Sequence, residues 1–462
     1  MNPKHLFLVS AASALLFSAA IMAADPYAST YQRIPAPPTV IENATILTGT
    51  GERLDSASIL FADGAVQAVG ESVESVRLDY EEIEVVDAQG RWVTPGLIDV
   101  HSHLGVYPSP GMVAHSDGNE ATAPATPNVW AEHSLWPQDP GFTHALAGGV
   151  TSMQLLPGSA NLFGGRTVTV KNLPRNSYQA MKFPGAPHGL KMACGENPKR
   201  VYGTGKGVTP GTRMGNVAGY RDQWAKAQKY IHDWQQYDEL VEAGDTTAKE
   251  PERNLGLDTL AGVLTGDIKI HMHCYRADEM LLILDVAKEF GYSVGTFHHG
   301  VETYKIADEL AEAGVCAAIW SDWWGFKMEA YDGILENVAM TDIPEGSCAI
   351  VHSDSSQLIQ RLNIEAGKAM TSGRRMGLDI TPEHAIRWIT YNPAKSLGIE
   401  DQTGALEPGK MADVVIWSGN PFSVYTLADR VYLDGAAVYD RFDPALQPVS
   451  DFELGQSLEV SP

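Results

Sequence analysis

Two histidines separated by a single residue are the first groups in this chain that could bind a metal ion. They are His101 and His103, and they end the apolar stretch Gly96-Leu-Ile-Asp-Val-His-Ser-His103. Alternate side chains along a strand point to the same face, so the two imidazoles are expected to project together. Two imidazoles on one face can share a cation such as Zn²⁺. The pair therefore predicts a metal site at the end of a strand.

Three later strand-like stretches also end in histidine or aspartate. The residue nearer the end of each stretch is expected to reach the site, and these residues are His273, His299 and Asp354. The histidines just before them are expected to pack behind the site and orient its ligands; they are His271, His298 and His352. Side chains at successive strand ends converge on one rim of a barrel, where barrel enzymes do their chemistry.

The elements that position these residues alternate between short apolar strands and amphipathic helices over residues 95–400. The predicted strands are Leu97–His101, Thr151–Leu155, Val168–Val170, Leu190–Cys194, Ile268–His273, Ser293–Phe297, Cys316–Ile319 and Cys348–His352. Eight strands alternating with helices indicate an α/β fold of the (β/α)8 TIM-barrel type, and the third strand has the weakest pattern. A doubly wound open sheet is the alternative, but no Gly-rich dinucleotide motif follows the first strand.

The regions flanking the barrel resemble each other in pattern. Residues 24–94 and 401–443 both contain short strands with Asp-Gly hairpin turns, which predicts one small β-sandwich built from both chain ends. Residues 444–462 are expected to form a loose tail. The 462-residue length fits one large domain plus a smaller one.

The N-terminus predicts the location of the protein, and the net charge limits its possible partners. Residues 1–23 carry Lys4 and then an apolar run of small residues, which predicts a cleaved signal peptide and a periplasmic or secreted protein; an uncleaved membrane anchor is the alternative. The net charge of -24 argues against nucleic acid or anionic membrane as a partner.

The chain has four cysteines, which are far apart in the sequence. They are Cys194, Cys274, Cys316 and Cys348. Export would allow disulfides to form. Each cysteine lies in an apolar strand-like segment, however, so we expect four buried small hydrophobic side chains.

The sequence resembles the amidohydrolase superfamily, in particular imidazolonepropionase-related hydrolases and exported dipeptidase-like amidohydrolases. The resemblance covers nearly all of the chain after residue 23. It rests on Thr94–His103, Gly148-Gly-Val-Thr-Ser152, His299-Gly300, Ser353-Asp354, Tyr391–Gly398 and Thr403–Asp413. It implies a distorted barrel with one or two divalent metal ions, usually zinc. His101 and His103 would bind one ion, His273 and His299 the other, and Asp354 would contact the first ion and move protons.

Two-metal members of this superfamily also have a bridging carboxylate, which is either a glutamate or a carboxylated lysine. The matching segment is Gly189-Leu-Lys-Met-Ala-Cys-Gly-Glu196. Glu196 lies at the end of the predicted strand, whereas Lys191 lies near its beginning. We therefore expect Glu196 to be the bridge and keep Lys191 as the alternative, together with a site that holds one metal and no bridge.

Substrate contacts are expected on loops that follow the strands. Trp323, Trp324 and Lys327 follow the predicted seventh strand and are candidates to line a pocket and hold a substrate carboxylate, although aromatic clusters more often pack than bind. Arg213 and Arg276 lie near other predicted rim loops. A cationic rim would suit an anionic small molecule such as a peptide carboxylate.

The expected function is hydrolysis of an amide or cyclic-amide C–N bond, for example in a dipeptide or an N-acyl amino acid. Metal-activated water would attack, with Asp354 as general base and then acid. A ring deaminase of the same superfamily is one alternative. An exported, non-catalytic metal- or ligand-binding protein is another. The sequence favours a small-molecule substrate, no nucleic acid and no membrane after signal cleavage, and leaves an oligomer open.

Overall fold

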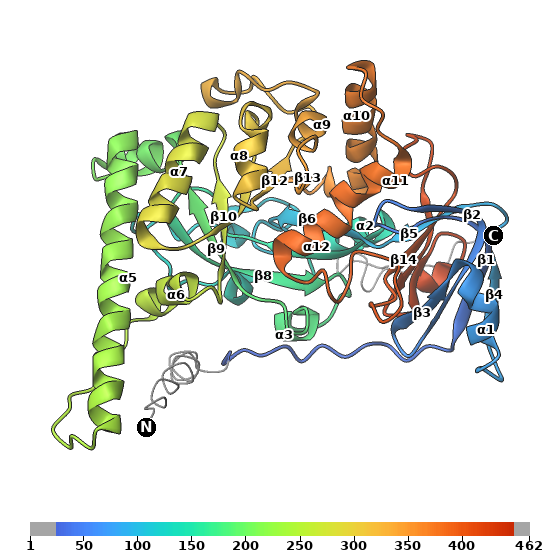
Figure 1. The fold of residues 1–462 in the computed structure, drawn as a ribbon, viewed down its shortest axis with the longest axis horizontal. Coiled ribbons are helices and arrows are strands. Elements are labelled where there is room, and N and C mark those ends of the chain that lie inside the picture. Colours follow the sequence, from blue (N-terminus) through green and yellow to red (C-terminus); the bar gives the residue numbers. More distant parts are fainter. Residues whose placement is uncertain (1–24, 448–462) are drawn as a thin grey trace, which may run out of the picture.

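The computed structural model describes residues 25–447, which form an eight-stranded barrel and a second eight-stranded sheet. Figure 1 shows the barrel at the centre and the second sheet at the right. The predicted signal peptide and residues 448–462 of the predicted tail lie outside the described residues. Within residues 25–447, no helix is both long and apolar enough to cross a membrane.

The barrel strands follow one another in chain order around the sheet. They are β6 (Leu97–Ser102), β7 (Val150–Leu155), β8 (Phe163–Lys171), β9 (Gly189–Ala193), β10 (Lys269–His273), β11 (Val294–His298), β12 (Cys316–Ile319) and β13 (Ala349–Val351). Most of their residues are buried on both faces, as expected for strands enclosed by helices. The predicted barrel with a small β domain is therefore confirmed.

Strand β8 differs from its prediction in length and in direction. It spans nine residues, where the sequence predicted Val168–Val170 alone, and it pairs antiparallel with both β7 and β9. Its first part contains Gly164 and Gly165, and Gly165 has a φ of +116°, a backbone conformation that few other residues adopt. Glycines carry no strand pattern, which is why the sequence revealed only the second half of β8.

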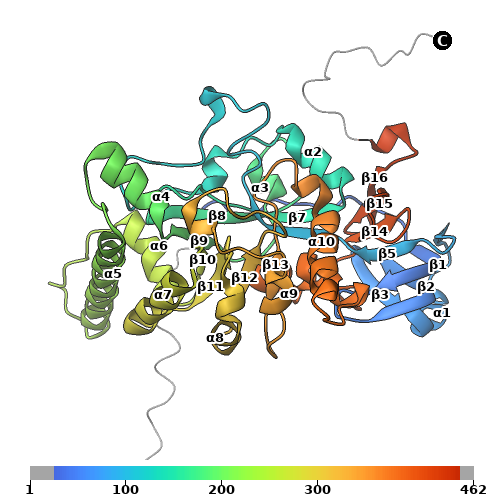
Figure 2. The same ribbon diagram turned by 90° about the horizontal axis from the view of Figure 1, so that it is seen from above.

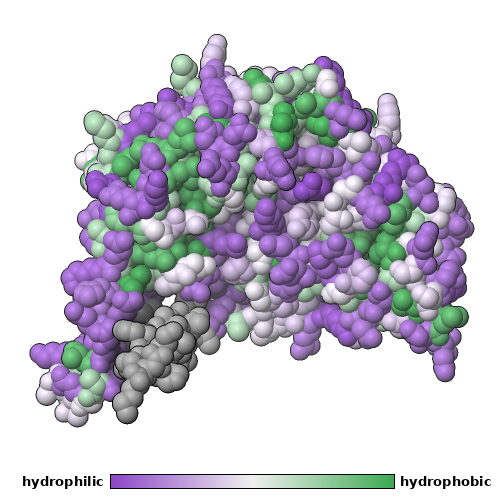
Figure 3. All heavy atoms as spheres, viewed as in Figure 1, coloured by the Kyte–Doolittle hydropathy of each residue, from purple (hydrophilic) through white to green (hydrophobic). Residues whose placement is uncertain are grey.

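Helices surround the barrel and also lie between it and the second sheet (Figures 1 and 2). They are α1 (Val73–Arg77), α2 (Pro140–Ala147), α3 (Tyr178–Met181), α4 (Glu196–Pro198), α5 (Arg213–Glu242), α6 (Leu255–Leu264), α7 (Ala277–Phe290), α8 (Ala307–Glu312), α9 (Asn337–Thr341), α10 (Leu362–Arg375), α11 (Pro382–Ala385) and α12 (Tyr391–Leu397), with a π-helical segment at Lys199–Thr204. The 30-residue helix α5 extends beyond the barrel at the left of Figure 1, and Figure 3 shows that its projecting part is mostly hydrophilic.

The second sheet is built from both ends of the described chain. Its strands are β1 (Thr39–Leu47), β2 (Arg53–Ala62), β3 (Ala65–Val69), β4 (Glu84–Asp87), β5 (Trp92–Pro95), β14 (Val414–Trp417), β15 (Ala428–Leu433) and β16 (Ala436–Asp440). Strand β14 pairs antiparallel with β5, which joins the two ends of the chain immediately before β6 enters the barrel. The sheet therefore holds the start of the first barrel strand in place.

The four cysteines form two disulfides, so the expectation of four free, buried side chains is wrong. Cys194 pairs with Cys274, and Cys316 pairs with Cys348. Each bond joins neighbouring parallel strands at matched positions, β9 with β10 and β12 with β13. Residues far apart in the sequence become neighbours only once the barrel forms, which is why spacing alone did not reveal the pairs.

Candidate metal centre

Two histidines and one carboxylate meet at the end of strand β6. Asp354 Oδ1 lies 3.5 Å from His101 Nε2 and 3.3 Å from His103 Nε2. His103 Nδ1 lies 2.8 Å from the Leu156 carbonyl oxygen, which can only accept, so Nδ1 carries the proton. The Nε2 lone pair of a neutral His103 would then face a carboxylate oxygen. A cation satisfies both atoms, either as a proton on Nε2 or as a metal ion, and two imidazoles with one carboxylate are a donor set that binds metal ions.

The barrel closes at this point through a buried aspartate on β6. Asp99 accepts hydrogen bonds from the His101 and Ser353 backbone N–H groups and from the Ser353 hydroxyl. The Asp354 N–H also donates to the His101 carbonyl oxygen at 3.0 Å. Burial raises the pKa of Asp99 to about 7, opposed by these hydrogen bonds. Asp99 therefore fixes the segment that carries Asp354 against the segment that carries His101.

Asp354 and His299 share an uncommon backbone conformation. Asp354 has a φ of +49° and His299 a φ of +63°. Non-glycine residues in this left-handed region cost energy, and they concentrate at functional sites, where the surrounding structure holds them. His299 directly follows β11, and Asp354 lies three residues beyond β13, so both strained residues lie at the carboxyl end of the barrel.

Lys191 is the group that strand β9 brings to His101. Its side chain is completely buried, and Nζ lies 3.4 Å from His101 Nε2. Among the described residues, none forms an ion pair with Lys191. Burial lowers its pKa to about 7, with a smaller opposing effect from Asp354.

Glu196, the residue predicted to bridge the metal ions, forms an ion pair with a lysine. It begins helix α4 after β9, and its carboxylate pairs with Lys327 Nζ at 3.3 Å. Strand β9 runs from Gly189 to Ala193, and Lys191 on it reaches the barrel interior beside His101. The expectation that Lys191 lies too deep in its strand to reach the site is wrong, because the long lysine side chain covers the distance to His101.

His273 has a polar neighbour at each of its two ring nitrogens. Nδ1 lies 2.9 Å from Ser159 Oγ, and Nε2 lies 3.3 Å from Asn197 Nδ2. The amide nitrogen of Asn197 can only donate, so Nε2 of His273 is the unprotonated nitrogen and Nδ1–H donates to Ser159. His273 Nε2 therefore uses its lone pair to accept from the Asn197 amide in this structure, and a metal ion bound by His273 would take the place of that hydrogen bond.

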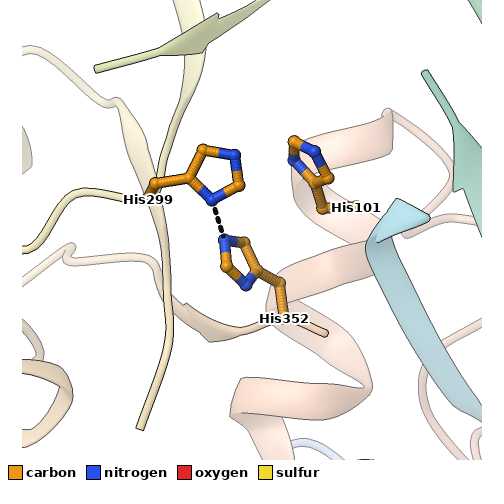
Figure 4. A group of neighbouring side chains, drawn as sticks. All are labelled: His101, His299 and His352. Carbon is orange, nitrogen blue, oxygen red and sulfur yellow. Dashed lines mark hydrogen bonds between the residues drawn. The ribbon is translucent and has the colours of Figure 1, made fainter. Parts of the chain in front are cut away.

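His299 joins His273 to the Asp354 side of the site. Its ring lies 4.7 Å from the ring of His273 and 4.4 Å from that of His101, measured between centroids. Nδ1 lies 3.8 Å from Asp354 Oδ2 and 3.0 Å from His352 Nε2. His101, His299 and His352 each turn a ring nitrogen toward a shared space, as Figure 4 shows. His352 is thus closer to the ligand set than the sequence suggested.

Burial keeps the histidines of this cluster uncharged. Desolvation lowers the pKa of His101, His273, His298 and His299 well below the usual value, and neighbouring cationic groups add to the effect. The pKa of His352 falls to about 4 for the same main reason. Neutral imidazole is the form that binds metals, so the electrostatics agree with the geometry.

The rim next to His299 is a stack of aromatic rings. Trp320 lies parallel to His299 with centroids 4.3 Å apart, and Trp323 stacks on Trp320 at 5.4 Å. Tyr275 stacks beside them, and Lys327 Nζ lies 4.1 Å above the Tyr275 ring. Trp323 is 39% exposed, so the stack runs from the site to solvent.

The other predicted substrate residues lie further from the cluster or are already paired. Trp324 is 44% exposed and packs against Gly333. Arg213 pairs with Glu279 and Glu329, and Arg276 pairs with Asp278 at the start of α7. Of the predicted set, Lys327 and Trp323 are therefore the two that the structure places beside the aromatic stack at His299.

Several site residues were not predicted from the sequence. They are Ser159, Asn197, Asp99, Tyr275 and Trp320. Asn197 follows Glu196, and Asp99 lies in the stretch that ends at His103, so the sequence pattern around them gave a weak indication of their role. Ser159 and Tyr275 lie on loops with no pattern of their own.

Comparison with known proteins assigns the chain to a family. The profile of the Amidohydrolase family matches residues 92–441. The chain is 31% identical to Amidohydrolase tasK from Hapsidospora irregularis over 441 residues, which is 88% of this chain and 44% of that protein. The chain thus spans less than half the length of that relative. It is also 25% identical to imidazolonepropionase from Shewanella sp. (strain W3-18-1), covering 79% of this chain and 87% of that protein.

A solved structure gives the same result. The crystal structure of an amidohydrolase from Thermotoga maritima MSB8 superposes with a TM-score of 0.77 and 36% identity, over 87% of this chain and all of that chain. The family profile covers most of the chain, and the metal-binding geometry lies within the matched residues. The chain therefore belongs to the Amidohydrolase family.

Proposed function

We propose that this protein is a metal-dependent hydrolase that cleaves a C–N bond in a small, anionic amide such as a dipeptide or an N-acyl amino acid. The observation that carries the proposal is the approach of His101 Nε2 and His103 Nε2 to one oxygen of Asp354, at 3.5 and 3.3 Å, because two imidazole nitrogens and a carboxylate form a donor set that binds divalent metal ions. The family membership and the hydrolases among the relatives support the reaction class.

The residues present would hold one or two divalent ions. His101, His103 and Asp354 would bind the first, and His273 and His299 the second. Lys191, carboxylated on Nζ, would lie between them, since it is buried against His101 without an ion-pair partner. Bound metal would polarise the substrate carbonyl and lower the pKa of a water ligand toward neutrality. Zinc suits this ligand set, although histidine and carboxylate ligands also accept manganese, iron or cobalt.

The protein's own groups would supply the proton transfers and the binding contacts. Asp354 lies against His101 and His103, and it would take a proton from the attacking water and pass it to the leaving nitrogen. Asn197 would offer its amide N–H to the substrate beside His273. Lys327 would bind the substrate carboxylate, with the Trp320 and Trp323 rings against the adjacent apolar part.

The test combines metal analysis with a substrate screen on the purified protein. We expect stoichiometric metal and hydrolysis of dipeptides or N-acyl amino acids. The variant Asp354→Asn should keep its metal and lose most turnover. Release of ammonia from a heterocycle, with no cleavage of dipeptides, N-acyl amino acids or cyclic amides, would assign a ring deaminase instead. Metal retention with no hydrolysis of any class would favour the non-catalytic binder.

The two disulfides support the proposal that the protein is exported, because such bonds persist in the periplasm and outside the cell. We expect the mature protein in the periplasm or the medium, with an N-terminus close to residue 24. N-terminal sequencing of the fractionated protein tests this. A chain that starts at Met1 and stays with the membrane fraction would instead indicate an uncleaved anchor.

A further inference from the structure

Three buried imidazoles form a continuous line from the metal centre into the barrel. His101 Nδ1 lies 2.9 Å from His298 Nδ1, and His298 Nε2 lies 3.0 Å from His271 Nδ1. All three side chains are buried, on strands β6, β11 and β10. His298 uses both ring nitrogens for its two neighbours, so it serves as a link within the line.

A neutral imidazole has one N–H donor and one acceptor nitrogen, so each contact in the line needs a proton on one side only. Two arrangements satisfy both contacts. In the inward arrangement, His101 Nδ1–H donates to His298 and His298 Nε2–H donates to His271. In the outward arrangement, His271 Nδ1–H donates to His298 and His298 Nδ1–H donates to His101. Fixing one proton therefore fixes all three rings.

The two arrangements differ at the atom that faces the metal position. In the outward arrangement, His101 Nε2 carries a proton that points toward Asp354 Oδ1, 3.5 Å away, and cannot bind a cation. In the inward arrangement, His101 Nε2 is a bare lone pair. We propose that metal binding at His101 selects the inward arrangement, and that His298 is a positioning residue that holds His101 in its metal-binding tautomer. This inference rests on the proposed metal-dependent function.

Gln154 lies near the far end of the line. In the inward arrangement His271 Nε2–H needs an acceptor, and the buried Gln154 Oε1, which has no hydrogen-bond partner among the described residues, would have to turn toward it. Both side chains border the space above Gly189: a Cβ there would lie 2.5 Å from His271 Cδ2 and 3.1 Å from Gln154 Nε2. Gln154 Nε2, the amide atom nearest the line, donates to Thr167 Oγ1 at 2.8 Å, which keeps the Gln154 side chain beside His271. Gly189 leaves room for this end of the line.

The direct test reads the tautomers by nitrogen NMR on protein labelled with ¹⁵N-histidine, before and after Zn²⁺ is added to the metal-free enzyme. We expect the Zn²⁺-bound protein to hold His271 in the Nε2–H form, although His271 lies two rings from the ion. Bound Zn²⁺ with His271 in the Nδ1–H form would overturn the inward arrangement and leave the proposed function intact. A protein that binds no Zn²⁺ would overturn the proposed function itself.

Two variants of His298 test the same point through affinity. His298→Phe keeps a planar ring and removes the acceptor, and it should weaken Zn²⁺ binding by about 10- to 100-fold in a chelator competition. His298→Asn keeps an oxygen near the position of Nδ1 and should restore most of the affinity. Equal losses in both variants, or wild-type affinity in His298→Phe, would contradict the role assigned to His298. The wild-type NMR measurement decides the matter if His298→Phe does not fold.

Discussion

Two lysines of the barrel are completely buried, yet their surroundings are opposite. Lys171, at the end of β8, lies 2.9 Å from Asp413 and 2.6 Å from Asp434, which come from the second sheet and the segment before it. Lys191, on the neighbouring strand β9, has no ion-pair partner among the described residues and faces the imidazole of His101. The same residue type thus appears once with its charge matched and once without.

This difference in ion pairing indicates that Lys171 is a structural residue and Lys191 a functional one. A buried charge is tolerated when carboxylates and hydrogen bonds compensate the lost hydration, as at Lys171. The surroundings of Lys191 instead favour its neutral amine, and its pKa falls to about 7 because of burial. A lysine buried without an ion-pair partner indicates that the functional site includes a further group that interacts with it, and we propose that this group is the pair of metal ions. Four predictions test this contrast, in order of decreasing effect.

Lys191→Met should remove function and leave the fold. The loss of the group between the two proposed metal positions should lower turnover on the order of 10³-fold and reduce the bound metal, since metal ions supply several kcal/mol of transition-state stabilisation. Turnover measured with excess metal, together with metal analysis of the purified protein, gives the result. Full activity with full metal content would show that Lys191 is no part of the centre.

Lys171→Met should have the opposite effect: it should lower stability and leave the activity of the folded protein. It leaves Asp413 and Asp434 buried without their cation, and breaking a buried pair of this kind costs about 3–5 kcal/mol. Urea unfolding should show that loss, whereas kcat of the folded fraction should stay close to that of the wild type. A Lys171→Met protein that is stable but inactive would place Lys171 in the function and would break the contrast.

Lys327 is an intermediate case, because it is partly buried and paired with Glu196. If it binds the substrate carboxylate, Lys327→Met should raise KM for anionic substrates by about 10- to 100-fold, the value of a charged hydrogen bond. Its matched control, Glu196→Gln, frees Lys327 and should lower that KM a few-fold, as expected for a partly exposed pair. Metal content should stay unchanged in both. Loss of metal in Glu196→Gln would restore Glu196 to the bridging position.

The sequence was sufficient for the parts of the molecule that depend on local pattern. Apolar strands that end in His101, His103, His273, His299 and Asp354 predicted the barrel and the residues that now lie together. The parts that depend on contacts between distant segments were missed or misplaced. Both disulfides, the antiparallel direction of β8 and the approach of Lys191 to His101 depend on how neighbouring strands align, and no single segment of the sequence determines that alignment.

The last prediction concerns the pH dependence of stability, whose effect for each pH unit is the smallest of the four. The unfolded chain holds a proton on Lys191 up to a pKa of about 10.4, whereas the folded protein releases it near pH 7. Between these values the unfolded state binds more protons, so the free energy of unfolding of the metal-free protein should rise with pH. The contribution of one group is at most about 1.4 kcal/mol per pH unit.

Urea unfolding of the metal-free protein in CO₂-free buffers from pH 7 to 10 measures this slope. Lys191→Met should lose the rising part, because the titrating group is gone. Lys171→Met should keep it at a lower overall stability, because Lys191 is still present. The buried histidines do not interfere, since unfolded histidine titrates near pH 6.5 and their folded pKa values lie lower still. Parallel curves for the wild type and Lys191→Met would mean that Lys191 keeps its charge in the folded protein, and the two buried lysines would then differ in their neighbours but not in their protonation.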